Sequence, residues 1–296
     1  VTGWSLTEDK PMKVPAVSVW LHIPPLTASE RFTLPISTGC ATHTDLRQAL
    51  ANAICELIER DAIALTWLQE MLLPKLVFDS VSPALQAALS TADESGVHVQ
   101  FFDATSELGI PTFYSVDTDA NNPTVRHMVM CATGPNPDEV VIKMLREMAS
   151  SRIALTTEEE IPEDIEDFHS VFHGARYMGV PERSDAFEFL LNSTTPARNL
   201  SDVRAMPAGD PAAQLAHLLN ALKSHDMHAV AVDITTNEAK AAGLSVVRVV
   251  IPELMPLSFA HTSRYLAHPR LYEGPRAMGY PSHPEPDINP NPQPFA

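Results

Sequence analysis

The order of apolar and polar positions along the chain predicts helices and strands that alternate without a repeat. Apolar residues that recur every three or four positions are typical of helices with one buried face. This periodicity predicts four helices: Asp45 to about Met71, Ser82 to Glu94, Pro137 to about Leu155, and Ala212 to Lys223. Two of them are expected to start at a proline preceded by a capping residue, Ser82 in one case and Asn136 in the other.

Shorter apolar runs between these helices predict strands, because they are rich in β-branched and aromatic residues and end at turn-forming residues. Five runs fit this description: Val14 to Leu21, Val97 to Phe102, Arg126 to Ala132, His228 to Asp233, and Ser245 to Ile251. The mixture of helices and strands indicates an α/β (α+β) fold with mixed sheets flanked by helices.

The pattern changes after Ile251, where ten of the 26 prolines lie. We expect one domain over residues 1–283 and a proline-rich C-terminal tail over residues 284–296. Proline-rich ends are usually extended docking segments, and a stiff tail can also be laid into a site at a modest cost in entropy. Both interpretations of the tail remain open.

Five polar residues form one stripe on the first predicted helix, at Gln48, Asn52, Glu56, Glu59 and Arg60. Residues spaced by three and four positions share a helix face. The simpler interpretation is a solvent-facing stripe with a Glu56–Arg60 pair worth a few tenths of a kcal/mol. The functional interpretation is an acidic face that binds Mg²⁺, which prefers oxygen ligands and accompanies phosphates.

The helix after Pro137 carries a second stripe, formed by Lys143, Glu147, the serines at 150 and 151, and Arg152. It is again either a solvated face with a Lys143–Glu147 pair, or a carboxylate and a cation suited to a polyphosphate.

Composition narrows the classes of function. The chain has 296 residues, 45% of them hydrophobic, and a net charge of −17. So acidic a surface repels nucleic acid, and no basic cluster offsets it. The three cysteines are widely spaced and predict neither disulfides nor a zinc site. No run is long enough for a membrane helix and no secretory leader is visible, so we expect a cytoplasmic protein without a membrane partner.

Several familiar site motifs are missing from the sequence. There is no GxxxxGK[ST] loop and no GxGxxG, so an ATP site would depend on acidic helices and metal. The histidines show no HExxH spacing. Cys40, in a predicted tight turn with His43 nearby, is a minor candidate for a nucleophile, while Cys55 fits the apolar side of its helix.

Together, these features resemble the YcaO family, of the type that forms azolines in ribosomally made peptides. The resemblance rests on the following segments: the turn Ser37-Thr38-Gly39, the helix core ELIERDAIALTW from Glu56 to Trp67, the turn Gly134-Pro-Asn-Pro leading to Glu147 and Arg152, the segments Asp233-Ile-Thr-Thr and Val246 to Pro252, and the ending NPQPFA.

The resemblance implies an ATP- and Mg²⁺-dependent cyclodehydratase. In such enzymes a Cys, Ser or Thr side chain attacks the preceding amide, ATP phosphorylates the amide oxygen, and phosphate leaves. By motif position, the implied cofactor-binding residues are Ser37, Gln48, Glu56, Glu59, Arg60, Glu147 and Arg152, and the implied Mg²⁺ ligands are Glu56, Glu59 and Glu147. The tail residues that would order the cyclisation centre are Pro292, Pro294, Phe295 and Ala296.

The implied partners are a ribosomal precursor peptide and a separate leader-binding protein or domain. A dehydrogenase partner and a homodimer are also compatible with the resemblance.

The chain departs from the family pattern at several positions. Gln48 stands where a glutamate is usual, Thr42-His43 replaces a small Ala-Gly pair, and Ser150 replaces a glutamine. An earlier ExxER helix is missing, and the chain begins at Val1. We therefore expect the larger C-terminal part of the YcaO domain, or a naturally shortened member. Alternatives are a non-catalytic scaffold or peptide-binding subunit, and a thioamide-forming YcaO.

Overall fold

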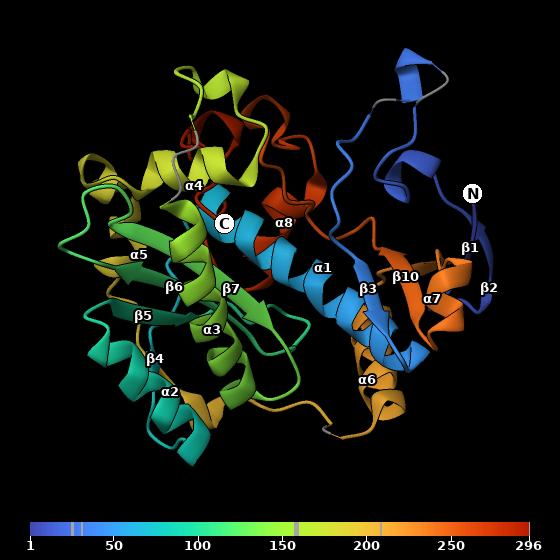
Figure 1. Cartoon of the computed structure of the whole chain (residues 1–296), viewed down its shortest axis with the longest axis horizontal. Helices are drawn as coiled ribbons and strands as arrows, with labels where there is room; N and C mark the ends of the chain where they lie inside the picture. The colour runs from blue at the N-terminus through green and yellow to red at the C-terminus, as the bar shows by residue number, and fades with distance from the viewer. Residues whose placement is uncertain (25–26, 31, 157–159, 208, 296) are drawn as a thin grey trace. The chain divides into compact units, whose positions relative to one another are not determined.

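The computed structural model describes residues 1–24, 27–30, 32–156, 160–207 and 209–295 (Figure 1). The chain divides into two compact units. The first combines Val1–Arg60 with Met206–Leu254, and the second combines Asp61–Ala205 with Met255–Ala296.

The first unit is built on a five-stranded antiparallel sheet of order β2-β1-β9-β10-β3. Its strands are β1 (Thr2–Ser5), β2 (Lys10–Lys13), β3 (Cys40–His43), β9 (Val230–Asp233) and β10 (Ser245–Val250). Its helices are α6 (Pro211–Ser224), α7 (Asn237–Ala241) and the first fifteen residues of α1 (Leu46–Leu68). The predicted strands over 228–233 and 245–251 and the predicted helix over 212–223 are confirmed.

Helix α1 begins where the sequence predicts it. Asp45 caps it, because its Oδ1 accepts a hydrogen bond from the Arg47 amide at 2.7 Å. Small and branched apolar residues such as Ala49, Ala53 and Ile54 are fully buried along one side. The expected helix from Asp45 to about Met71 is thus confirmed within a few residues at its C-terminal end.

The second unit contains a three-stranded antiparallel sheet, β5-β6-β7, and a short parallel pair, β4 with β8. Its strands are β4 (Leu76–Val77), β5 (His98–Asp103), β6 (Thr112–Thr118), β7 (His127–Thr133) and β8 (Arg198–Asn199). Its helices are α2 (Pro83–Glu94), α3 (Pro137–Leu155), α4 (Val171–Gly179), α5 (Glu188–Leu191) and α8 (Pro269–Ala277). Ser82 and Asn136 cap α2 and α3 as predicted.

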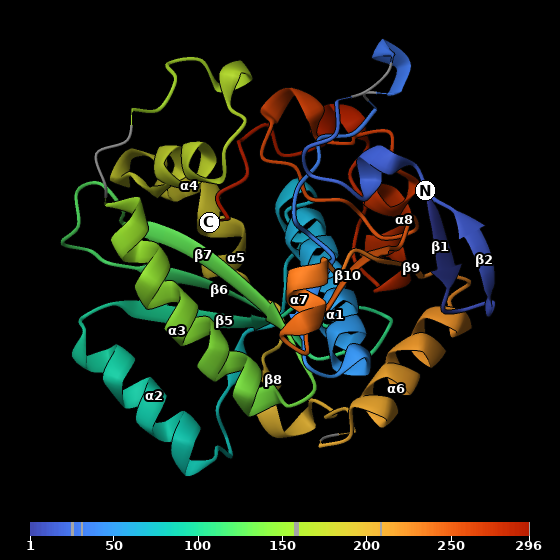
Figure 2. The same ribbon diagram turned by 45° about the vertical axis from the view of Figure 1, so that its right-hand side comes forward.

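The three-stranded sheet is covered on both faces, because successive side chains of a strand point to opposite sides. On β7, Met128 and Met130 join the cluster with α2 and α3, whereas Val129 and Cys131 join the cluster with the end of α1. Figure 2 shows α2 and α3 on the same side of this sheet. Burial on both sides explains why β7 reads as a continuous apolar run.

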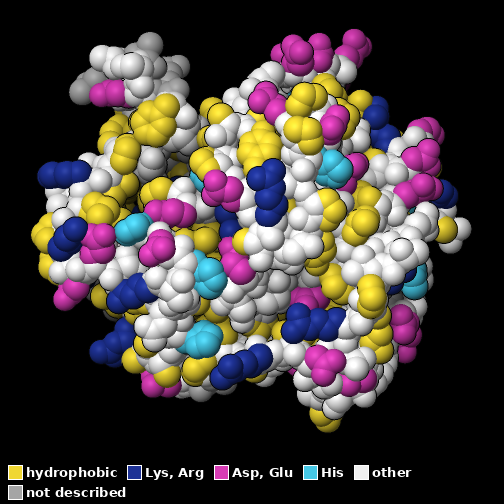
Figure 3. All heavy atoms as spheres, turned by 180° about the vertical axis from the view of Figure 1, so that it is seen from behind, with side chains coloured by type: hydrophobic (Ala, Val, Ile, Leu, Met, Phe, Trp, Pro, Cys, Tyr) yellow, Lys and Arg dark blue, Asp and Glu magenta, His cyan; other side chains and the backbone are white. Residues whose placement is uncertain are grey.

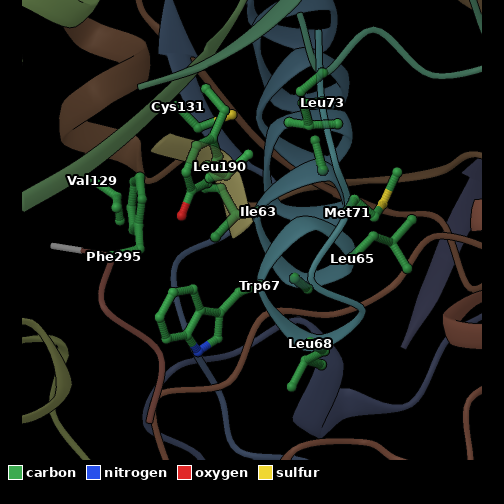
Figure 4. Packing of buried hydrophobic residues seen from close by; sticks show 14 of the residues in the cluster. Ile63, Leu65, Trp67, Leu68, Met71, Leu73, Val129, Cys131, Leu190 and Phe295 are labelled. Atoms are coloured by element: carbon green, nitrogen blue, oxygen red, sulfur yellow. The ribbon is translucent and has the colours of Figure 1, made fainter. Parts of the chain in front are cut away.

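The C-terminal tail is packed into the second unit. Ile288 and Phe295 belong to its core, and Phe295 forms a parallel bridge with Val129 of β7 (Figure 4). The tail also caps α1, because the Asn289 amide donates to the Leu68 carbonyl at 3.0 Å and its Nδ2 donates to the Trp67 carbonyl at 3.1 Å. These are carbonyls of the last helical turn, which have no partner within the helix.

One predicted strand is wrong, and the strands β1, β2, β3, β4, β6 and β8 were not expected. The segment from Val14 to Leu21 contains the 3₁₀ turn Ala16–Ser18 and no strand. Pro15 precedes this turn and lacks an amide for a ladder, and Val14 and Val19 are buried as core residues instead. Strand β6 escaped prediction although Phe113, Tyr114 and Val116 are wholly buried in it.

Charged side chains of both signs are spread over the face seen in Figure 3. Among the described residues, no helix has the length and apolarity needed to span a bilayer.

Candidate functional site

Three charged side chains of α1 form a compact group. The Arg60 Nη2 lies 3.6 Å from Glu56 Oε1 and 3.7 Å from Glu59 Oε1. Only 26% of the Glu56 side chain, 6% of Glu59 and 20% of Arg60 is exposed. A solvated helix face would expose them far more, so these three residues do not fit the simpler interpretation, although Asn52 is exposed and the expected Glu56–Arg60 pair is present.

The turn at Ser37-Thr38-Gly39 meets this group. The Gly39 amide donates a hydrogen bond to Glu56 Oε2 at 3.0 Å. Gly39 has a φ of 84°, and a Cβ there would lie 2.5 Å from the Val249 carbonyl oxygen. Glycine is therefore required both for the turn and for its close approach to β10. Two features that the sequence singled out separately are thus joined by a hydrogen bond.

Burial governs the electrostatics of Glu56. Desolvation raises its pKa above the usual value, while the Gly39 amide and the Arg60 guanidinium act in the opposite direction. A carboxylate that is costly to ionise gains most from an added cation.

The other candidates of the first unit lie at the same turn and helix. Gln48 donates from Nε2 to Asn52 Oδ1 at 2.8 Å, two turns before Glu56. The Ser37 side chain is exposed.

The second stripe belongs to the second unit. Lys143 Nζ lies 3.8 Å from Glu147 Oε1, and both side chains are almost half exposed. Arg152 is mostly buried and donates from Nη2 to Asp117 Oδ2 at 2.7 Å and from Nη1 to the Val125 carbonyl at 2.6 Å. The prediction that Glu147 and Arg152 complete one site with Glu56 stays a prediction.

The Arg152 contact lies beside two buried groups with displaced pKa values. Burial raises the pKa of Asp117 to about 6, against the opposing effect of Arg152. Burial also lowers the pKa of His127 to about 4, with Arg126 and Arg152 acting in the same direction.

The tail residues with an expected catalytic role are buried in the second unit. Pro292, Pro294 and Phe295 are all buried, and the Asn291 carbonyl accepts from the Trp67 indole at 3.2 Å. Ala296 lies outside the described residues. Their role in ordering a cyclisation centre stays a prediction.

Sequence reasoning overlooked two buried arginines. Arg270 of α8 forms ion pairs with Asp61, at 2.8 Å, and with Glu107. Arg248 of β10 lies within the apolar run VVRVVI, and a charged residue in such a run was the signal that could have identified it.

Glu56 and Glu59 provide a donor set that suits Mg²⁺ in part. Carboxylate oxygens are its usual protein ligands, and it commonly completes its shell with water and substrate phosphates. In the described part of the chain, no group of three or more His, Cys, Asp or Glu residues could hold a metal ion by itself. The pair therefore fits a metal that arrives with phosphates better than a metal enclosed by protein ligands.

The sequence matches the family described as YcaO cyclodehydratase, ATP- and Mg²⁺-binding, over residues 1–255. The chain belongs to this family. The match confirms the resemblance inferred from the motifs, and it confirms ATP and Mg²⁺ as the cofactors that describe the family.

Solved structures confirm the mixed α/β fold. A heterocyclase in complex with substrate and cofactor aligns with 99% of this chain and 38% of its own, at a TM-score of 0.80 and 22% identity. YcaO from Methanopyrus kandleri, bound with AMPPCP and Mg²⁺, aligns with 86% of this chain and 63% of its own, at 0.66 and 18%. The Escherichia coli microcin synthetase McbBCD complex with pro-MccB17 bound aligns with 100% and 72%, at 0.63 and 16%.

Sequence relatives are distant and longer. An uncharacterized protein in the tfuA 3′ region of Rhizobium leguminosarum bv. trifolii is 28% identical over 130 residues, which are 40% of this chain and 30% of that protein. An uncharacterized protein of Methanothermobacter thermautotrophicus is 27% identical over 157 residues, 51% and 40% of the two chains. The matched regions thus span well under half of these curated relatives.

Proposed function

We propose that this chain carries part of the active site of an ATP- and Mg²⁺-dependent cyclodehydratase. The substrate would be a ribosomal precursor peptide whose Cys, Ser or Thr residues become azolines. One observation carries the proposal: the Gly39 amide holds Glu56 beside Glu59 and Arg60 on a largely buried face of α1.

In this proposal Glu56 and Glu59 hold the metal, and Arg60, which lies near both carboxylates, offsets part of their charge. When bound, ATP supplies the phosphoryl group that makes the amide oxygen a leaving group, and Mg²⁺ neutralises phosphate charge. The chain itself binds and orients, because the burial of Glu59 excludes water and strengthens each electrostatic contact.

The remaining candidates have supporting roles. Ser37 and Gln48 provide neutral polar atoms at the turn and the start of α1. Glu147 is the third proposed carboxylate ligand, since its side chain is accessible. Arg152, which fixes α3 to β6 through Asp117, is proposed to complete the nucleotide site together with Glu147.

The tail would order the peptide at the cyclisation centre through Pro292, Pro294, Phe295 and Ala296. A separate leader-binding partner is part of the proposal, supported by the McbBCD neighbour, which is a complex with pro-MccB17 bound. A reducing, cytoplasmic setting is also part of the proposal, since the three cysteines are few and widely spaced in the sequence.

The test is calorimetric titration of the full chain with ATP in the presence and absence of Mg²⁺. Glu59→Gln keeps the shape of the side chain and removes its charge, so we expect Mg²⁺-dependent binding to weaken by at least about tenfold. Glu94→Gln, an exposed residue at the end of α2, is the matched control and should bind as the wild type does. Equal affinities of the Glu59→Gln variant and the wild type would favour the non-catalytic scaffold instead.

A further inference from the structure

Arg248 is a buried cation for which the described part of the chain provides no ion-pair partner. Arg248 lies in β10 between Val247 and Val249 in sequence, and 9% of the residue is exposed. Among the described residues, the other arginine this deeply buried is Arg270, which Asp61 and Glu107 neutralise. Burying a guanidinium is costly, so Arg248 requires a different explanation.

The hydrogen-bond partners of Arg248 include groups at both ends of one turn. Its Nε donates to the Ser18 carbonyl at 3.1 Å, and its Nη1 donates to the Ile36 carbonyl at 2.7 Å and to Cys40 Sγ at 3.2 Å. Ile36 and Cys40 stand immediately before and after the turn Ser37-Thr38-Gly39. The guanidinium therefore holds both ends of this turn.

Main-chain bonds complete the attachment of the turn to β10. The Cys40 amide donates to the Ser37 carbonyl at 2.8 Å, which closes the turn, and the Val249 amide donates to the Gly39 carbonyl at 2.8 Å. The Gly39 amide is left to point at Glu56. Strand β10 thus holds the turn through the Arg248 side chain and through the Val249 amide. The turn then holds Glu56 through the Gly39 amide.

We propose that Arg248 is a positioning residue of the nucleotide site, which aligns the Gly39 amide with Glu56 by clamping the Ile36 carbonyl and the Cys40 thiol. This inference rests on the proposed function of Glu56 and Glu59. It adds a residue that is remote in sequence from both motifs.

The test compares three variants of the full chain. Arg248→Met keeps approximately the length of the side chain and removes every hydrogen-bond donor. Arg248→Lys keeps the positive charge but replaces the planar guanidinium with a single nitrogen. Val232→Ala is the control, because Val232 is the register partner of Arg248 on β9 and belongs to the valine core of this unit. It should lower stability without touching the turn.

Two measurements are made on each variant at a temperature where all are folded. Hydrogen exchange at the amides of residues 36–40 should accelerate in Arg248→Met, by about tenfold or more, and stay at the wild-type rate in Val232→Ala. The affinity for Mg²⁺–ATP should fall about tenfold in Arg248→Met and less in Arg248→Lys, and change little in Val232→Ala.

The outcomes separate this inference from the proposed function. Wild-type exchange at residues 36–40 in Arg248→Met would overturn the positioning role, as would an equal loss of affinity in Val232→Ala. If Glu59→Gln weakens Mg²⁺–ATP binding and Arg248→Met does not, the role of Arg248 alone is wrong. If the wild-type chain does not bind Mg²⁺–ATP while exchange still responds to Arg248→Met, the clamp stands and the proposed function fails.

Discussion

At the scale of single residues, the buried charges of this chain differ in what compensates them. Arg270 has two carboxylate partners, whereas Glu56 has a main-chain amide as well as Arg60. The attraction within a buried ion pair offsets the free energy of desolvation only when the geometry of the pair is good. The contacts of Arg60 with Glu56 and Glu59 are long, at 3.6 and 3.7 Å, and the pKa of Glu56 is raised. This arrangement stabilises the fold poorly, but it is suitable for binding a cation.

Gly39 is the residue where this arrangement is easiest to break. Gly39→Ala should strain the positive φ and press its Cβ against the Val249 carbonyl, so the turn moves away from Glu56. We expect a loss of about 1–3 kcal/mol in the free energy of unfolding and at least about tenfold weaker Mg²⁺–ATP binding, measured by denaturant unfolding and calorimetry.

Gly243→Ala is the control for backbone strain alone. Gly243 also has a positive φ, of 75°, but a Cβ there would meet nothing within 4 Å. It should lose stability and keep its nucleotide affinity. Equal weakening in both variants would mean that the Gly39–Glu56 contact has no special role.

At the scale of elements, the C-terminal tail packs against α4, and its close approach to this helix requires a glycine at position 174. A Cβ on Gly174 would collide with the Gln293 carbonyl, whereas a Cβ on Gly179 of the same helix would lie 3.2 Å from the His127 carbonyl oxygen and away from the tail. Gly174→Ala should therefore displace the tail, and Gly179→Ala should leave it in place.

The displacement can be followed by limited proteolysis and by hydrogen exchange over residues 288–295. Faster exchange there in Gly174→Ala, with Mg²⁺–ATP affinity retained, is the expected result, because Asn289 and Asn291 of the tail hydrogen-bond to Trp67 at the end of α1. An undisturbed tail in Gly174→Ala would show that this helix does not hold it.

The sequence predicted elements where local signals decide them. Ser82 and Asn136 each stand before a proline and an apolar periodicity, so the starts of α2 and α3 were readable. The predicted strand from Val14 to Leu21 was wrong because β-branched residues are common in strands and also at other buried positions. The contact between Gly39 and Glu56 could not be read from the chain, since it joins residues 17 positions apart through packing.

At the scale of the whole molecule, the response of stability to pH combines two buried groups in the second unit. The raised pKa of Asp117, about 6, stabilises the fold below its unfolded pKa near 3.8, and this contribution is lost as pH rises through 6. The lowered pKa of His127, about 4, stabilises the fold above 6.5 and is lost as pH falls through 4. The two effects oppose each other between pH 4 and 6.

Asp117→Asn removes one of these effects. Its unfolding midpoint in urea should fall more steeply than that of the wild type as pH decreases from 6.5 to 4, since only the His127 effect remains. Asp119→Asn is the matched control, because Asp119 lies 4.0 Å from the same arginine and is a quarter exposed. Parallel curves for Asp117→Asn and the wild type would contradict the burial argument.

The central claim is that Glu56 and Glu59 form a metal–nucleotide face, and electron paramagnetic resonance with Mn²⁺ in place of Mg²⁺ tests it most directly. Adding the wild-type chain to Mn²⁺ and ATP should convert the signal of the free complex to that of a protein-bound one. Glu59→Gln should leave most of the complex free, and Glu94→Gln should behave as the wild type. A bound signal of equal intensity in Glu59→Gln would contradict the assignment of this face.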